Sequence, residues 1–566
     1  MVFTGCGGGN SGSSGRPAPP PPSASFQVTV NVSGSGTVTS SPAGIDCGQT
    51  CSATFSNGTA VSFTASPAPG SSFGGWSGAC SGTNSCSLTV TASTTLGATF
   101  AGSGSLQSIN HIVFMVQENR SFDHYFGALR EYWAQNGFPD QPFDGLPQFN
   151  IPAGPSAFNP GCDPAFPFVT SPAPFNDCVI DANSPPVNSY HLITQCVENP
   201  SPSWNESHVD WNVANPLSST PTLDGFVHTA GKEIRDLMYV PGQNTPESDV
   251  NGLRVMGYYD STELPYYYFM ASNFATSDRW FMPIMTRTPA NRMYLMAATS
   301  AGRVYPPAPG SPRMSNKTIF EELNSAGISW RVYVTDDQDV PLMNGSELSG
   351  YNFAIAHPDH FVSATQFLTD AQNGTLPAVS EIDPGFVKGL DEHAEQDDSH
   401  PGGRIQVGAQ YVSTLINGLM QSPSWKDTVF ILTWDESGGF YDHVPPQPTV
   451  SPDGIAPSVN IDLKPGDICT TGTGLTCDFV VTGYRVPLIV ISPFTKKNFV
   501  SHTVSDYTAI LKFIETRFGV PNLTSRDAAQ MDMTEFFDFK NPPWMIPPGN
   551  VPVQPTSAPC YMDHLP

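Results

Sequence analysis

The stretch that decides the fold is His111-Ile-Val-Phe-Met-Val-Gln-Glu-Asn-Arg-Ser-Phe-Asp-His-Tyr-Phe-Gly127. Its apolar run from Ile112 to Val116 is typical of a buried strand, and polar residues follow it directly. Because ligands bind at the carboxyl ends of the strands in open α/β sheets, Glu118 and Asn119 are candidate ligand-binding residues. The alternative is a strand followed by a helix that Asn119 or Ser121 caps.

A second stretch repeats this pattern, namely Val429-Phe-Ile-Leu-Thr-Trp-Asp-Glu-Ser-Gly-Gly439. An apolar strand is again followed by acidic residues, here Asp435 and Glu436. Together the two strands present three carboxylates and one carboxamide, which suit a hard cation. Because three crowded carboxylates repel one another, a cation or protons must neutralise them. The sequence therefore predicts a metal site formed by Glu118, Asn119, Asp435 and Glu436.

The motif Glu-Asn-Arg-Ser-Phe-Asp-His-Tyr-Phe-Gly, residues 118–127, resembles the opening motif of the bacterial phosphoesterase family. That family contains phosphatidylcholine-type phospholipases C and an acid phosphatase. The resemblance runs from about Ser108 to about Gly519. It implies an α/β fold for a catalytic domain of residues 108–566. This fold is an alkaline-phosphatase-like three-layer α/β/α sandwich with a mixed, mostly parallel sheet.

The hydrophobic pattern of this region agrees with an α/β fold, because apolar runs alternate with helical segments and long loops. The strand candidates are Ile112–Val116, Ser329–Val334, Thr428–Thr433 and Val486–Ile491. The helix candidates are Ile319–Ala326, Val407–Met420 and Thr508–Phe518. Residues 150–220 and 440–480 have few regular elements, so we expect them to form loops over the ligand edge of the sheet.

The segment Thr-Arg-Thr-Pro-Ala-Asn-Arg, residues 286–292, resembles the family's Gly-Pro-Thr-x-Pro-Asn-Arg motif. Alignment on the Asn-Arg pair implies that Thr288 is the nucleophile. Thr286 remains a rival, because Met-Thr replaces Gly-Pro and the Pro-Ala order is inverted. A free Thr hydroxyl is a poor nucleophile at neutral pH, so coordination to the metal would help to form its alkoxide and make Thr288 a further ligand. The alternative is that Thr288 caps a helix whose first residue is Pro289.

Five further side chains are candidates for contacts with the substrate. Asn291 and Arg292 are expected to touch phosphate oxygens, although Arg292 could equally form a structural ion pair. His400 lies in a segment that resembles the family's His-Pro segment, and it is the first candidate for protonating the leaving oxygen. His208 matches a second family position, where a proline replaces a further histidine that the family often has upstream. His443 follows the second acidic pair closely and could bind substrate or be structural.

The predicted ligands decide which metal is expected. A set of carboxylates, a carboxamide and a Thr hydroxyl consists only of oxygen atoms, which favours Ca, Mg or Mn. Zn is possible if a histidine joins the set. The sequence therefore predicts one or more divalent metal ions as cofactors.

Composition limits the class of partner. The chain has 24 Lys+Arg against 50 Asp+Glu, a formal net charge of -26. This charge argues against nucleic acid and against tight electrostatic docking on anionic membranes. No protein partner is implied, and no apolar run reaches the eighteen or so residues of a membrane-spanning helix. Eleven cysteines indicate an oxidising compartment, so we expect a secreted, cell-surface or periplasmic protein.

The first 25 residues resemble the end of a bacterial lipoprotein signal, followed by a Gly/Ser-rich and then Pro-rich tether. The apolar region expected before the cysteine is missing from the sequence. Cys6 as a lipid-bearing residue is therefore a hypothesis, and its alternative is an unpaired cysteine in a flexible tail.

Residues 26–101 predict a small all-β domain, because several runs alternate with period two between Gly and Pro residues. Phe26–Val32, Ala60–Ala65 and Cys86–Thr91 are examples. The domain resembles the bacterial repeat related to internalin B-repeats, which implies a spacer or an adhesion module.

The cysteines are expected to pair within local loops. We predict the disulfides Cys47–Cys51 and Cys80–Cys86 in the small β domain, where they would stabilise a small core. Cys162 with Cys178 and Cys469 with Cys477 are candidate loop clasps, which leaves Cys196 and Cys560 to pin the C-terminal tail.

Three functions remain open from the sequence. The first is a phospholipase C that cleaves phosphatidylcholine-like phospholipids through a phosphothreonine. The second is an acid phosphatase with the same site and monoester substrates, and the third is a non-enzymatic surface adhesin. The tyrosines at 258–259 and 266–268 could bind a choline headgroup by cation–π contacts, with ordinary packing as the alternative.

Overall fold

The computed structural model describes residues 24–560, apart from short segments at 35, 49, 69–70, 84, 103–104, 169–176, 198–199, 239–248, 309, 338–340, 394–403 and 471–476. The chain divides into two compact units, Met1–Ser108 and Ile109–Pro566. Cys6 and His400, which the sequence singled out, lie outside the described residues.

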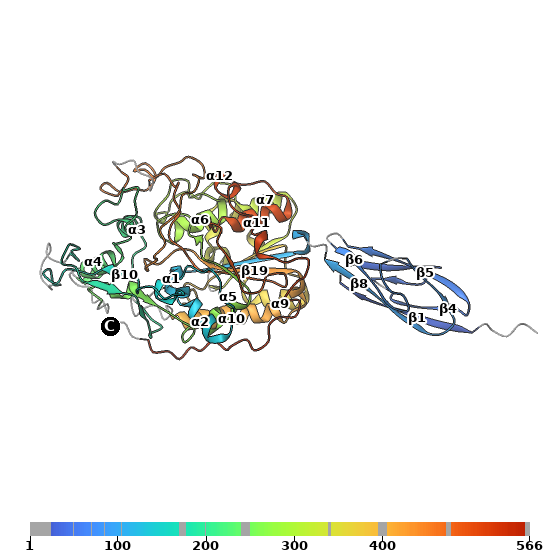
Figure 1. Cartoon of the computed structure of the whole chain (residues 1–566). Helices are drawn as coiled ribbons and strands as arrows, with labels where there is room; N and C mark the ends of the chain where they lie inside the picture. Colours follow the sequence, from blue (N-terminus) through green and yellow to red (C-terminus); the bar gives the residue numbers. More distant parts are fainter. Residues whose placement is uncertain are drawn as a thin grey trace, which may run out of the picture. The chain divides into compact units, whose positions relative to one another are not determined.

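The first unit is built from two four-stranded sheets that share one apolar core (Figure 1). In sheet order, the first sheet contains β4 (Ser52–Ser56), β1 (Ser25–Ser33), β8 (Thr94–Gly102) and β6 (Ser71–Gly78). The second contains β3 (Asp46–Cys47), β2 (Gly36–Ser41), β5 (Thr59–Pro67) and β7 (Cys86–Val90). Every second residue of a strand faces the core, as Val61 and Phe63 of β5 do. The predicted all-β unit is confirmed, and so are the disulfides Cys47–Cys51 and Cys80–Cys86.

The second unit is built around an eight-stranded sheet. In sheet order its strands are β17 (Phe361–Ser363), β16 (Trp330–Val334), β18 (Val379–Asp383), β9 (His111–Gln117), β19 (Thr428–Trp434), β20 (Leu488–Ile491), β14 (Ala275–Ser277) and β21 (Phe499–Ser501). The first five strands pair in parallel, and β20 runs antiparallel to both of its neighbours. The sheet is therefore mixed and mostly parallel, as predicted.

The two central strands hold the candidate site. All residues of β19 and all but the first of β9 are buried, because helices cover both faces of the sheet. The strands pair in parallel from His111 opposite Thr428 to Gln117 opposite Trp434. Their carboxyl ends therefore coincide, and the acidic residues that follow each strand start from the same edge.

Helices form a layer on each side of this sheet (Figure 1). One layer contains α6 (Thr288–Ala297), α7 (Ile319–Ser325) and α11 (Ala509–Phe518). The other contains α1 (Phe122–Phe126), α2 (Leu129–Asn136), α5 (Pro265–Asn273), α9 (Thr365–Asn373) and α10 (Ile405–Met420). The α/β fold class with three layers is confirmed. Among the described residues, none of the helices has the length and apolarity needed to cross a membrane.

Short elements complete the unit. The remaining helices are α3 (Trp204–Trp211), α4 (Phe226–Met238), α8 (Asn352–Ile355) and α12 (Ser525–Ala528). The remaining strands are β10 (Phe158–Pro160), β11 (Pro186–Asn188), β12 (Tyr190–His191), β13 (Gly257–Tyr258), β15 (Trp280–Phe281) and β22 (Ser505–Asp506). The expected loop region 150–220 thus contains α3. The three other predicted disulfides are also present, namely Cys162–Cys178, Cys469–Cys477 and Cys196–Cys560.

Candidate active site

The loops that follow β9 and β19 interlock at the carboxyl edge of the sheet. The backbone N–H of Asn119 donates to Asp435 Oδ1 over 3.2 Å, and that of Arg120 donates to the Glu436 carbonyl over 3.0 Å. Asn119 has φ 62°, a left-handed conformation that asparagine adopts more readily than most residues. Gly438 has φ 66° and approaches the Asn119 carbonyl so closely that a Cβ there would collide with it. This glycine therefore allows the two loops to meet.

Three carboxylates gather where the loops meet. The exposed fractions of Glu118, Asp435 and Glu436 are 5%, 0% and 0%. Burial, together with the nearby Asp435 carboxylate, raises the pKa of Glu118 and that of Glu436 well above the usual range. The side-chain amide of Asn119 lies against both glutamates, and its nitrogen is the atom that donates to the Glu436 carboxylate and, over 3.2 Å, to Glu118 Oε2. Buried carboxylates this close together form an arrangement that a cation would stabilise.

Arg292 supplies positive charge to this group. Its guanidinium lies 2.9 Å from Glu118 Oε1 and 3.3 Å from Asp435 Oδ2, and it also donates to the Val116 carbonyl over 2.8 Å. Its exposed fraction is only 1%. The two carboxylates outweigh the effect of burial and raise the pKa of Arg292. Of the two readings from the sequence, these contacts correspond to the structural ion pair.

Thr288 is the hydroxyl that reaches the acidic group. It is the first residue of α6 and is half-buried, and its Oγ1 donates to Glu118 Oε2 over 2.9 Å. The rival Thr286 is fully buried and donates to the Val304 carbonyl over 2.6 Å. The expectation that Thr288 caps the helix is wrong, because Arg287 holds the N-cap position and the Thr288 hydroxyl points to Glu118 instead.

The phosphate contact expected of Asn291 stays a prediction, and its side-chain amide binds the protein backbone. Its Oδ1 accepts a hydrogen bond from the Ile284 N–H over 3.1 Å, and its Nδ2 donates to the Thr286 carbonyl over 2.5 Å. Both ends of the side-chain amide thus bind the backbone of the loop before α6. Because this loop leads into Thr288, Asn291 positions the hydroxyl rather than pointing into the acidic group.

The oxygen donors fit a hard divalent cation in their chemistry. Glu118, Asn119, Asp435, Glu436 and Thr288 all carry a side-chain oxygen, and their role as metal ligands stays a prediction. Within the described part of the chain, however, the sets of acidic and imidazole groups that converge within 4.8 Å are two others. These are Asp123 with Asp442 and His443, and His191 with Asp260 and Glu263. The chain therefore carries acidic and histidine clusters that are compatible with divalent metal binding.

His208 lies in the interior of α3. It is fully buried, its Nδ1 lies 2.6 Å from the Trp204 carbonyl oxygen, and its ring packs against the Trp204 ring at 4.1 Å. These contacts belong to its own helix.

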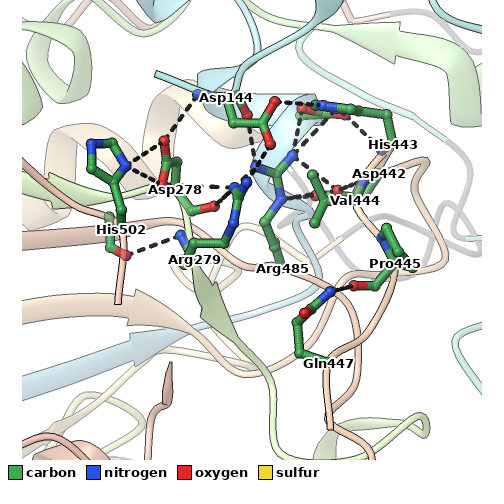
Figure 2. A network of polar contacts seen from close by, with 12 residues as sticks. Asp144, Asp278, Arg279, Asp442, His443, Val444, Pro445, Gln447, Arg485 and His502 are labelled. Carbon is green, nitrogen blue, oxygen red and sulfur yellow. Dashed lines mark hydrogen bonds and ion pairs between the residues drawn. The ribbon is translucent and has the colours of Figure 1, made fainter. Parts of the chain in front are cut away.

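His443 lies in a separate charged network, shown in Figure 2. Its Nδ1 is 2.6 Å from Asp123 Oδ2, and its Nε2 is 3.1 Å from Asp144 Oδ1. Arg485 binds Asp442 at 2.9 Å and Asp123 at 3.0 Å in the same network. Burial opposes the charged imidazole, but Asp123 and then Asp144 outweigh it and raise the pKa of His443 to about 10. His443 is thus held as an ion-pair partner, which is the structural alternative from the sequence.

Four of the five tyrosines follow the packing alternative, whereas Tyr258 is only half-buried. Tyr259, Tyr266, Tyr267 and Tyr268 are fully buried. Burial also keeps the hydroxyls neutral by raising the pKa of Tyr266, Tyr267 and Tyr268. These rings offer no open face to a choline group.

Sequence reasoning missed several residues beside the site. His393 Nδ1 lies 2.6 Å from Asp391 Oδ1, and the Asp391 carbonyl accepts a hydrogen bond from the Glu118 N–H over 2.9 Å. The His393 imidazole is partly exposed. It adjoins the acidic group through Asp391. The run Asp391-Glu-His393, seven residues before His400, was the available signal.

A half-buried hydroxyl beside buried carboxylates at the carboxyl edge of an α/β sheet is compatible with the hydrolysis of phosphoric esters. The chain belongs to the Phosphoesterase family, whose model matches residues 109–521, and the chain is a phosphoesterase. The model of the divergent InlB B-repeat domain matches residues 26–104. Both resemblances seen in the sequence are thereby confirmed.

Several curated relatives are similar over most of this chain. Phospholipase C B of Mycobacterium tuberculosis (strain ATCC 25618 / H37Rv) is 32% identical over 471 residues, which cover 78% of this chain and 80% of that protein. The hemolytic phospholipase C of Pseudomonas aeruginosa is 28% identical and covers 77% of this chain and 57% of that protein. Non-specific phospholipase C5 of Arabidopsis thaliana is 29% identical, and the match covers 70% of this chain and 66% of that protein. Among solved structures, a protein in the alkaline phosphatase superfamily from Vibrio parahaemolyticus matches with a TM-score of 0.29 and 10% identity, over 49% of this chain and 65% of that one.

Proposed function

We propose that this phosphoesterase is a phospholipase C that cleaves phosphatidylcholine-like phospholipids between glycerol and phosphate. The observation that carries the proposal is the Thr288 hydroxyl, half-buried and hydrogen-bonded to Glu118 at the start of α6. The relatives named phospholipase C support the choice of a diester substrate. The α/β unit, residues 108–566, would carry this activity.

In the proposed reaction the Thr288 oxygen attacks phosphorus and forms a phosphothreonine. The hydroxyl proton passes to the Glu118 carboxylate, whose Oε2 accepts the hydrogen bond from the Thr288 hydroxyl. The bond between phosphorus and the glycerol oxygen breaks, and that oxygen takes a proton from an acid of the site. Water then hydrolyses the phosphothreonine, which releases the phosphorylated headgroup. Asn291 serves the first step by fixing the loop that presents the hydroxyl.

The proton donor is proposed to be a histidine. His400 and His208 are the candidates from the sequence, and His393 is a third because it adjoins Glu118 through Asp391. If a His393→Asn variant keeps its activity, His400 and His208 remain as the candidate proton donors. Loss of the basic limb of the pH–rate profile in that variant would assign the role to His393.

The metal proposed for the site is held by Glu118, Asn119, Asp435, Glu436 and Thr288. A bound Ca, Mg or Mn ion would supply electrostatic stabilisation of the phosphoryl oxygens. The buried carboxylates, whose pKa values are raised by burial and by their mutual repulsion, would lose their protons when they bind it.

The N-terminal part is proposed to attach the enzyme to a surface. Residues 1–25 would form a tether with a lipid on Cys6, and residues 26–101 a spacer. A secreted or periplasmic location follows from this arrangement. Mass spectrometry of the N-terminus of the native protein tests it, since an unmodified Cys6 contradicts the anchor.

The test of the function is paired hydrolysis of p-nitrophenyl phosphorylcholine and p-nitrophenyl phosphate across pH, with and without a chelator. Preference for the choline diester, lost on chelation, supports the proposal. Preference for the monoester at acid pH makes the chain an acid phosphatase. Hydrolysis of neither substrate with metal supplied contradicts both and favours the surface adhesin.

A further inference from the structure

Two neighbouring hollows lie beside the start of α6. The open cleft has a volume of about 670 Å³, and its lining includes Arg287, the residue before Thr288. The methionine hollow has a volume of about 160 Å³, and Pro289, Met293, Met296 and Met314 are part of its lining. Both hollows share Arg303, Pro307 and Ser311 as lining residues, so they are neighbours.

The chain itself places the nucleophile between the two hollows. Arg287 lines the first, Pro289 lines the second, and Thr288 stands between them in sequence. Both hollows therefore lie near the start of α6, although Thr288 itself lines neither of them. The substituents of a phosphodiester need two separate spaces, and two hollows of different size lie beside the residues that flank Thr288.

One wall of the methionine hollow is a face of α6. Pro289, Met293 and Met296 are spaced by four and three residues, so they share one side of the helix. Met314 and Tyr351, whose backbones form a parallel bridge, also line the hollow. The Tyr351 hydroxyl donates to the Met293 carbonyl over 3.4 Å and links this pair to α6.

The lining suits a flexible apolar group. Met293 and Met314 are 8% and 9% exposed, so their thioethers are nearly buried yet reachable from the hollow. Methionine side chains adapt their shape to alkyl chains at low cost. Glu347 also lines the hollow, and burial raises its pKa toward the neutral form. Arg303 and Arg313 also line the hollow, so its apolar part is the side formed by Met293, Met296 and Met314, where an uncharged group would lie.

We propose that the methionine hollow binds the first part of an acyl chain on the leaving group of the phospholipid, and that Met293, Met296 and Met314 determine this specificity. The inference rests on the proposed function, since it assigns one end of the same substrate. Such a hollow would favour a lipid diester over small phosphoesters, because small phosphoesters have no acyl chain to fill it.

The test compares two diesters with the same phosphocholine group. Dihexanoylphosphatidylcholine, kept below its micelle-forming concentration, carries acyl chains, and glycerophosphocholine has none. The measured quantity is the ratio of their kcat/KM values. Met314→Gln makes the hollow polar, and Gly350→Leu narrows it at a lining position where a Cβ meets no heavy atom within 4 Å. Each variant is expected to lower the ratio about tenfold, the effect of losing the burial of one or two methylene groups.

The matched control is Met420→Gln. Met420 is the last residue of α10, is 6% exposed, and lies in the helix layer on the other side of the sheet from α6 (Figure 1). It should leave the ratio unchanged. If both substrates are cleaved by the parent protein and the ratio is unchanged in both hollow variants, the acyl site is refuted while the phospholipase activity stands. If the parent protein cleaves neither substrate, the proposed function fails and the acyl site fails with it.

Discussion

Replacing His443 with glutamine should remove a pH-dependent part of the stability. The imidazole lies 2.6 Å from Asp123 and 3.1 Å from Asp144, and these carboxylates raise its pKa from 6.5 to about 10. The folded state therefore holds a proton that the unfolded state releases between these two pH values. The stabilisation is fully present below pH 6.5 and is lost as the pH rises toward 10.

The size of the effect follows from the shift. A difference of about 3.5 pKa units at 1.36 kcal/mol per unit sets an upper limit of roughly 5 kcal/mol. Asp144 is 34% exposed, so solvent screens part of this interaction. We expect the parent protein to exceed His443→Gln by about 2–4 kcal/mol at pH 7 and by less than about 1 kcal/mol near pH 10.

The assay is urea unfolding of the parent and variant proteins at pH 7, 8, 9 and 10, followed by the transition of the α/β unit. Groups common to both proteins cancel in the difference between their free energies of unfolding. The control is His502→Gln, because His502 also bonds a buried aspartate, Asp278 at 2.9 Å, but its side chain is 49% exposed. A difference for His443→Gln that stays constant from pH 7 to pH 10 would refute the reasoning.

Three further predictions concern the acidic group. Thr288→Ala should lower kcat at least about a thousandfold with an unchanged melting temperature, whereas Thr288→Ser should keep part of the activity; activity of the alanine variant within tenfold of the parent would move the nucleophile to Thr286. Asp435→Asn should weaken binding of Mn²⁺ at least about tenfold in calorimetric titrations, and in the parent protein affinity should rise with pH, because protons leave Glu118 and Glu436 when a cation binds. Equal affinity in both proteins would reject these ligands. Arg292→Met should destabilise the fold by about 3 kcal/mol in chemical denaturation, because it leaves two buried carboxylates without their guanidinium, and an unchanged midpoint would contradict the ion pair.

Much of the sheet could be predicted, because its central strands are unbroken apolar runs. The predicted strands at Ile112 and Thr428 agree with β9 and β19 within two residues. In contrast, β14, β17 and β21 are only three residues long, too short for a periodic signal. β18 was missed because Ser, Glu and Asp occupy buried positions in it. Tertiary contacts, and not local hydrophobicity, decide that segment.

The site was predictable where ligands follow a strand, and unpredictable where partners come from distant segments. Glu118 and Asp435 could be paired from their motifs alone. The hydrogen bond between His443 and Asp123 joins residues 320 apart in sequence, and that between Arg485 and Asp123 joins residues 362 apart. Sequence also gave no means to see that Asn291 binds the loop before α6, because only the folded loop brings the Thr286 carbonyl to its amide.

The most direct test of the central claim is to trap the phosphorylated enzyme. The protein is mixed with excess p-nitrophenyl phosphorylcholine, quenched in acid within one turnover, digested and analysed by mass spectrometry. The account predicts a single phosphorylcholine-bearing or phosphoryl-bearing peptide, modified at Thr288 and absent in Thr288→Ala. Modification at another residue, or turnover with no modified peptide at any quench time, would contradict it.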